Sequence, residues 1–149
     1  MARTAIIMAL LLCWIAGSAG AQETRSPVGM VKSVTGSAHV ERDGRRMPAT
    51  AGFVLFQGDR ITTGRDASLG ILLRDETALS LGSSTDTTVE RFVFEPDENK
   101  VGMVLRVARG FFGYISGKIA KLAPGSVRIE TPVATLGVRG THFVARIEP

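Results

Sequence analysis

The sequence is poor in the residues from which most active sites are built. It has one cysteine, Cys13, and that residue lies in the apolar N-terminal stretch. The rest of the chain can therefore form no disulfide and offers neither a thiol nucleophile nor a thiolate metal ligand. The two histidines, His39 and His142, stand near opposite ends of the remaining chain, in no spacing that presets a metal site.

Other catalytic patterns are also missing. The chain has no Gly-x-Ser-x-Gly motif of a serine hydrolase and no phosphate-binding loop that ends in Lys-Ser or Lys-Thr. Asp59, Asp75 and Glu90 could supply paired carboxylates, but Asp59 and Asp75 stand beside turn-forming residues, where aspartates usually accept hydrogen bonds from backbone amides. We therefore predict that the protein is not an enzyme and has no catalytic, metal-binding or cofactor-binding residue. A metal-dependent hydrolase remains an alternative.

Neither sign of charge dominates the sequence. Eighteen Lys and Arg residues face fourteen Asp and Glu residues, and the formal net charge is +4. The basic residues are interspersed with acidic ones, and Arg45-Arg46 is the longest basic run. Because proteins that bind nucleic acid usually carry a clustered basic stripe with aromatic residues, we predict no nucleic-acid partner.

The N-terminus has the order of a secretory signal peptide. Arg3 precedes an uncharged stretch, Ala5 to Ala16, which is followed by Ala19-Gly20-Ala21 and then by polar residues. As a helix this stretch would be about 18 Å long, whereas the hydrocarbon core of a membrane is about 30 Å thick. We predict that residues 1–21 are cleaved, that the protein is periplasmic or secreted, and that it meets the membrane only transiently, through this peptide. A retained anchor is the alternative.

Beyond a flexible lead-in at residues 22–28, apolar residues recur with a period of two. This alternation is typical of strands, and turn-forming residues interrupt it about every 8 to 12 residues. The pattern predicts a single all-β domain, a sandwich, barrel or solenoid, with at most one short helix at residues 117–123. The expected strands are residues 34–40, 53–56, 61–63, 67–73, 79–81, 87–94, 103–107, 111–115 and 126–131.

Three stretches resemble the FecR domain family. Residues 52–64 contain its G-D-x-I-x-T-G element, and residues 72–82 contain its D-G-T hairpin, with Glu76 where the family usually has glycine. Residues 131–143, TPVATLGVRGTHF, are similar to its closing motif T-P-x-A-x-x-G-V-R-G-T-x-F, which is the most specific of the three. The resemblance spans residues 29 to 146 and implies a FecR-like β domain at residues 29–149, solenoid-like or sandwich-like.

The resemblance also implies a function. Regulators of the ferric-citrate type join this domain, in the periplasm of a Gram-negative envelope, to a transmembrane helix and a cytoplasmic segment that controls a sigma factor. Because this chain shows neither segment, we do not expect sigma-factor control to carry over. The resemblance implies a signalling module that binds another envelope protein, with no catalytic residues to transfer. The alternative is a structural scaffold associated with the cell wall or a polysaccharide, with cell-wall glycan as its partner.

Two places are candidates for a partner contact. The first is an exposed strand edge or the segment around Phe111, Phe112 and Tyr114, because edge strands present unpaired backbone groups. Neighbouring residues of a strand face opposite sides, so at least one of the two phenylalanines should pack in the core. The second is Arg139, between Gly137 and Gly140; its alternative role is to tie a loop to the core.

Overall fold

The computed structural model describes residues 25–140 and 142–148. The predicted signal peptide lies outside these residues, and the first strand begins at Pro27, inside the predicted lead-in. Within the described part, no helix has the length and hydropathy needed to cross a membrane. The strands are β1 Pro27–Thr35, β2 Ala38–Arg42, β3 Arg45–Pro48, β4 Val54–Phe56, β5 Arg60–Thr63, β6 Ser68–Leu73, β7 Ala78–Leu81, β8 Asp86–Glu95, β9 Lys100–Ile115, β10 Val127–Glu130, β11 Thr135–Gly137 and β12 His142–Ile147.

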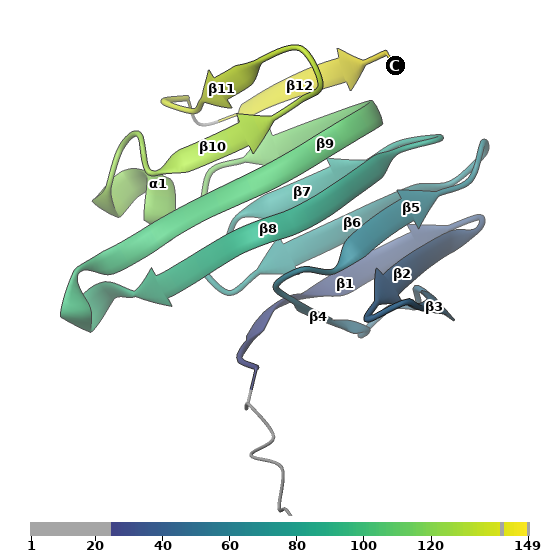
Figure 1. Cartoon of the computed structure of the whole chain (residues 1–149), viewed down its shortest axis with the longest axis horizontal. Coiled ribbons are helices and arrows are strands. Elements are labelled where there is room, and N and C mark those ends of the chain that lie inside the picture. Colours follow the sequence, from purple (N-terminus) through teal and green to yellow (C-terminus); the bar gives the residue numbers. More distant parts are fainter. Residues whose placement is uncertain (1–24, 141, 149) are drawn as a thin grey trace, which may run out of the picture.

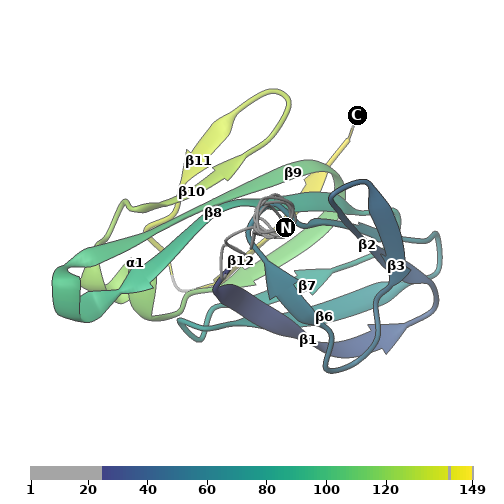
Figure 2. The same cartoon turned by 60° about the horizontal axis from the view of Figure 1, so that its bottom comes forward.

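The strands form one strongly curled sheet, a half-barrel (Figures 1 and 2). Its strand order is β3-β2-β5-β8-β9-β7-β6-β1-β4, and β10, β11 and β12 branch from it at β9. Neighbouring strands are antiparallel, except that β10 runs parallel to β9. A short helix, α1 (Lys118–Leu122), and a single turn of 3-10 helix at Pro96–Glu98 complete the described chain. The prediction of an all-β domain with at most one short α-helix is confirmed.

The long strand β9 connects the two parts of the sheet. Its first half pairs with β8 and β10, whereas its last residues pair with β7 and β12. The change of partners occurs at Gly110, whose φ of 102° is unfavourable for other residues. The prediction of two separate strands, broken at Gly110, was therefore wrong: the glycine bends one strand rather than ending it.

Two tight turns set the course of the first strands. Asp43 and Gly44 both have positive φ, of 51° and 75°, and they join β2 to β3 in the predicted two-residue hairpin. Gly36, with a φ of 73°, ends β1, so the predicted single strand at residues 34–40 is in fact the end of β1 followed by β2. A side chain at Gly36 would also collide with the backbone of Asp66.

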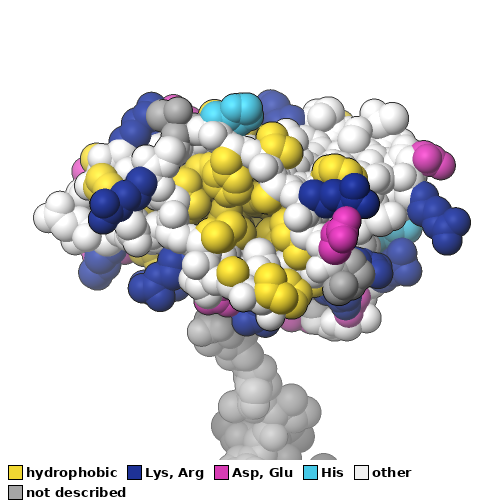
Figure 3. Space-filling model, turned by 90° about the horizontal axis from the view of Figure 1, so that it is seen from above, with side chains coloured by type: hydrophobic (Ala, Val, Ile, Leu, Met, Phe, Trp, Pro, Cys, Tyr) yellow, Lys and Arg dark blue, Asp and Glu magenta, His cyan; other side chains and the backbone are white. Residues whose placement is uncertain are grey.

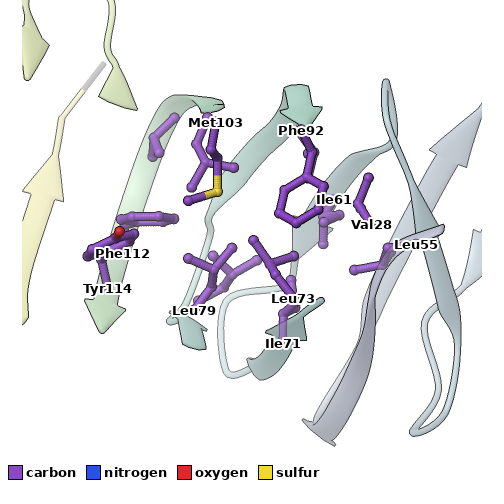
Figure 4. Packing of buried hydrophobic residues seen from close by; sticks show 14 of the residues in the cluster. Val28, Leu55, Ile61, Ile71, Leu73, Leu79, Phe92, Met103, Phe112 and Tyr114 are labelled. Carbon is purple, nitrogen blue, oxygen red and sulfur yellow. The ribbon is translucent and has the colours of Figure 1, made fainter. Parts of the chain in front are cut away.

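The concave side of the curled sheet encloses the hydrophobic core (Figure 4). The inward residues of each strand alternate with outward ones, as a period of two requires. Burial of each large apolar side chain contributes about 1.5–3 kcal/mol to stability. The largest fully buried side chains are Tyr114, Phe112, Leu55, Ile61, Leu79, Leu81, Met103, Leu105, Ile119, Ile129, Val31 and Val40.

Candidate partner-binding surface

Asp59, one of the two carboxylates considered for catalysis, holds a turn in place. Its side chain is completely buried and accepts hydrogen bonds from Arg42 Nε and Nη2, both at 2.7 Å, and from the backbone amide of Phe56 at 2.9 Å. The hydrogen bond and charge of Asp59 raise the pKa of Arg42. The Gly-Asp element therefore has a structural task, as turn chemistry predicts.

Asp75 has an equivalent task at the β6–β7 hairpin. Its carboxylate is fully buried and accepts hydrogen bonds from the amide and the hydroxyl of Thr77, at 3.1 and 2.7 Å. It also accepts one from the amide of Ile119, at 3.3 Å, and its backbone carbonyl accepts one from Lys118. Asp75 therefore fastens the hairpin to the start of α1, and its hydrogen-bonding capacity is used within the fold.

The histidines lie far apart and neither faces a cluster of ligands. His39 is half-buried on β2, where Arg46 Nη2 lies 3.2 Å from its Nδ1 atom. His142 is exposed on β12. Among residues 25–140 and 142–148, no group of three or more His, Cys, Asp or Glu side chains could hold a metal ion.

The residues proposed as partner contacts differ in burial. Phe112 and Tyr114 are fully buried and pack near Phe143, Tyr114 with a ring-centroid distance of 5.3 Å. The alternation of the strand turns both side chains into the core, so neither presents an exposed surface to a partner. Phe111 faces outward, is 41% exposed, and lies under the guanidinium group of Arg146.

Arg139 is exposed in the loop between β11 and β12. Its side chain makes no hydrogen bond or ion pair with another described residue, so a tie between this loop and the core is not seen there. Instead, Arg139 lines an apolar hollow of about 260 Å³ together with Leu136, Val138 and Phe143. A contact of Arg139 with a partner stays a prediction. A partner bound in this hollow would lie next to Arg139.

This hollow belongs to the open side of the half-barrel, which consists of β10, β11, β12 and the loop before β12. Figure 3 looks down on this side and shows hydrophobic side chains gathered near its middle. Leu136 is 41% exposed. The inward-facing residues of β12, namely Phe143, Ala145 and Ile147, are only half-buried, although residues in the same position on other strands are fully buried. The core is therefore incompletely covered here.

Two strand edges are free on the open side. Within the described chain, β11 pairs only with β10, and β12 pairs only with β9. Each strand therefore presents one row of unpaired backbone amides and carbonyls, the feature through which sheets accept a further strand. An apolar hollow next to two free edges can take both the backbone and the side chains of an extended peptide.

The sequence predicts an exposed strand edge but does not reveal this hollow. Leu136 and Val138 stand in the closing motif, and Phe143 ends it, so their apolar character is visible in the sequence. That they line a hollow depends on the pairing of β10 and β12 with different halves of β9, which no local pattern shows.

A family model described as FecR protein matches residues 59–149, which is more than half of the chain. No curated protein and no solved structure matches the chain.

Proposed function

The chain belongs to the FecR family, and we propose that it is a non-enzymatic signalling module that binds another protein of the bacterial envelope. The proposed contact surface is the open side of the half-barrel, where an extended segment of the partner would add a strand to β12. The observation that carries this proposal is the coincidence of free strand edges with the apolar hollow lined by Leu136, Val138 and Phe143.

The chemistry of the open side suggests what the partner presents. Hydrogen bonds between backbones would supply affinity, and alternate side chains of the added strand would point into the hollow. Arg139, exposed at the rim, would pair with a carboxylate of the partner. We therefore expect an extended, apolar segment that carries an acidic residue.

The proposal is tested by comparing two variants of the same stretch. Leu136→Asp places a charge in the hollow, whereas Val133→Asp places the same charge on a side chain that is 90% exposed and does not line the hollow. Each protein is expressed with its own N-terminal segment and used to capture envelope proteins, which are identified by mass spectrometry. We expect the wild type and Val133→Asp to capture the same partner in similar amounts. Leu136→Asp should capture at least about tenfold less of it.

Two results would contradict the proposal. One is a partner that Leu136→Asp retains as well as the wild type does, since the hollow would then take no part. The other is co-sedimentation with purified peptidoglycan in the absence of any captured protein, which would favour the scaffold alternative. The export prediction is checked on the same material, because cleavage after Ala21 leaves Gln22 as the N-terminal residue.

A further inference from the structure

One outer face of the sheet carries a continuous row of exposed apolar side chains. Cross-strand pairing places Val54 opposite Met30, Met30 opposite Leu72, Leu72 opposite Ala78, and Ala78 opposite Ile115. Residues directly paired across strands point to the same face, so these five side chains form one line across five strands. We call them the apolar row.

The members of the apolar row are well exposed. The exposed fraction is 42% for Met30 and Val54, 37% for Leu72 and 50% for Ile115. Leaving four large apolar side chains side by side in water is unfavourable, and contiguous patches of this kind usually mark an interaction surface. The end of the row at β4 and β6 also holds a hollow of about 240 Å³, lined almost wholly by apolar atoms.

Small residues form the neighbouring row on the same face. Ser33, Gly70, Ser80 and Gly113 are paired in sequence across β1, β6, β7 and β9. A side chain at Gly70 would lie only 2.6 Å from Ser33 Oγ. Over β6, β7 and β9 the neighbouring row therefore holds no bulky side chain, so a broad partner can approach these strands; on β12 the exposed His142 lies opposite Ile115, at the end of the apolar row.

Basic side chains predominate around the apolar row, and the two exposed acidic residues near it are paired, Glu76 with Lys118 and Glu148 with Arg146. The outward positions of β4, β1, β6, β7, β12 and the end of β9 hold no Asp or Glu, but they include Lys32 and Arg146, and Arg74 lines the hollow at the end of the row. A second copy of this chain would place these positive charges against each other. Charge complementarity instead favours an anionic partner.

The opposite outer face is built differently. There Arg60 binds Asp86 at 2.5 and 2.9 Å, and Arg106 lies 3.1 Å from Glu90 and 3.4 Å from Glu130. Charges of both signs neutralise each other on that face. The lack of acidic side chains at the outward strand positions beside the apolar row is therefore a local feature of one face.

We propose that the apolar row docks onto a membrane surface that contains anionic lipids. Its side chains would enter the boundary between headgroups and acyl chains, and Lys32 and Arg74, which form no ion pair with a described residue, would contact lipid phosphates. Apolar area and basic charge both strengthen binding to an interface that contains anionic lipids. This docking goes beyond the transient contact expected of a signal peptide and uses a face other than the open side.

The test is co-sedimentation of the purified protein, expressed with its own N-terminal segment, with lipid vesicles. Vesicles of phosphatidylcholine alone are compared with vesicles that also contain phosphatidylglycerol, at low and at raised salt. We expect the protein to sediment with the anionic vesicles, less at raised salt, and poorly with phosphatidylcholine. The double variant Met30→Thr, Leu72→Thr should lose at least about tenfold in affinity, because it removes apolar area from the centre of the row.

Val133→Thr is the matched control, because it removes a more exposed apolar side chain away from the row, and it should bind like the wild type. Circular dichroism establishes that each variant keeps its strands. The proposal is overturned if anionic vesicles leave the wild type in solution, or if Val133→Thr weakens binding as much as the double variant does. It is also overturned if sedimentation velocity shows a stable dimer that the double variant dissociates, since the row would then be covered by a second copy.

Discussion

Asp59 and Asp75 have no exposed surface, and each accepts three side-chain hydrogen bonds from groups brought together by the fold. At the scale of single residues, the motif positions of this chain are explained by such contacts. Thr77 shows the same principle, because its hydroxyl donates to Asp75 and accepts from the amide of Gly117. These carboxylates stabilise turns, and nothing in their geometry prepares them to act on a substrate.

Removing Asp59 should therefore destabilise the fold. Asp59→Ala leaves the Arg42 guanidinium and the Phe56 amide without their shared acceptor, and we expect the free energy of unfolding to fall by about 3 kcal/mol. Urea denaturation measures this change. Glu98→Ala is the control, because it breaks an exposed pair with Lys100 and should cost less than about 1 kcal/mol. Similar losses for both variants would show that the burial of Asp59 is unimportant.

Tyr114 should make stability sensitive to alkaline pH. Its hydroxyl is buried with no hydrogen-bond partner among the described residues, and burial, together with the charge of Asp75, raises its pKa above 10.0. Above pH 10 the unfolded chain ionises this tyrosine first. The full contribution of Tyr114 to the free energy of unfolding is therefore present below that pH. As the pH rises further, this contribution falls by up to about 1.4 kcal/mol per pH unit.

Because Tyr114 is the only tyrosine, its contribution can be isolated. Tyr114→Phe should flatten the alkaline decline of unfolding free energy relative to the wild type, because it removes the group that ionises. The measurement is a series of denaturation curves from about pH 8 to about pH 11, which covers both sides of the ordinary tyrosine pKa. Parallel curves for the two proteins would contradict the assignment.

At the scale of strands and turns, local chemistry predicted most of the fold. Alternating apolar residues located β6, β7 and β8 within a few residues, and Asp43-Gly44 gave the β2–β3 hairpin. The exceptions are glycines whose effect depends on distant strands. Gly36 ends a strand, whereas Gly110 bends one that continues, because β7 and β12 take over the pairing beyond it. The sequence around the two glycines does not distinguish these outcomes.

Glu76 stands where the FecR family usually has glycine, and the structure explains how the turn accommodates it. This residue adopts a φ of 68°, the left-handed conformation for which glycine is the natural choice, so the turn is kept and the side chain is strained. Glu76→Gly should raise the melting temperature, since the exposed ion pair with Lys118 that it removes contributes little. Differential scanning calorimetry gives the answer. A lower melting temperature would mean that the ion pair outweighs the strain.

Gly110→Ala should have the opposite effect. A methyl group there would collide with the backbone of Thr85, at a φ that alanine disfavours, so we expect a loss of about 3 kcal/mol or more in unfolding free energy. Gly137→Ala is the control, since a methyl group at Gly137 meets no atom within 4 Å. If both variants were equally stable, the bend of β9 would not depend on a glycine.

At the scale of the whole molecule, two surfaces stand out from an otherwise closed half-barrel. The open side leaves Phe143, Ala145 and Ile147 half-buried beside free strand edges, and the apolar row crosses five strands. The sequence predicts a free strand edge, but it shows neither the half-buried residues beside that edge nor the apolar row, because both depend on the register between strands that are distant in the chain. The apolar run Ile71-Leu72-Leu73 was a partial indication, since a strand with polar surroundings on one face would alternate.

Amide hydrogen exchange tests the central claim, that a partner adds a strand to the free edge of β12, most directly. The exchange of residues 142–148 is measured for the protein alone and in complex with the partner that the wild type captures. In the free protein, amides of β12 that bond to β9 should be protected and those on the free edge should exchange fast. The partner should slow the fast amides of β12 and of β11. Unchanged exchange in β12, with new protection elsewhere, would contradict the account.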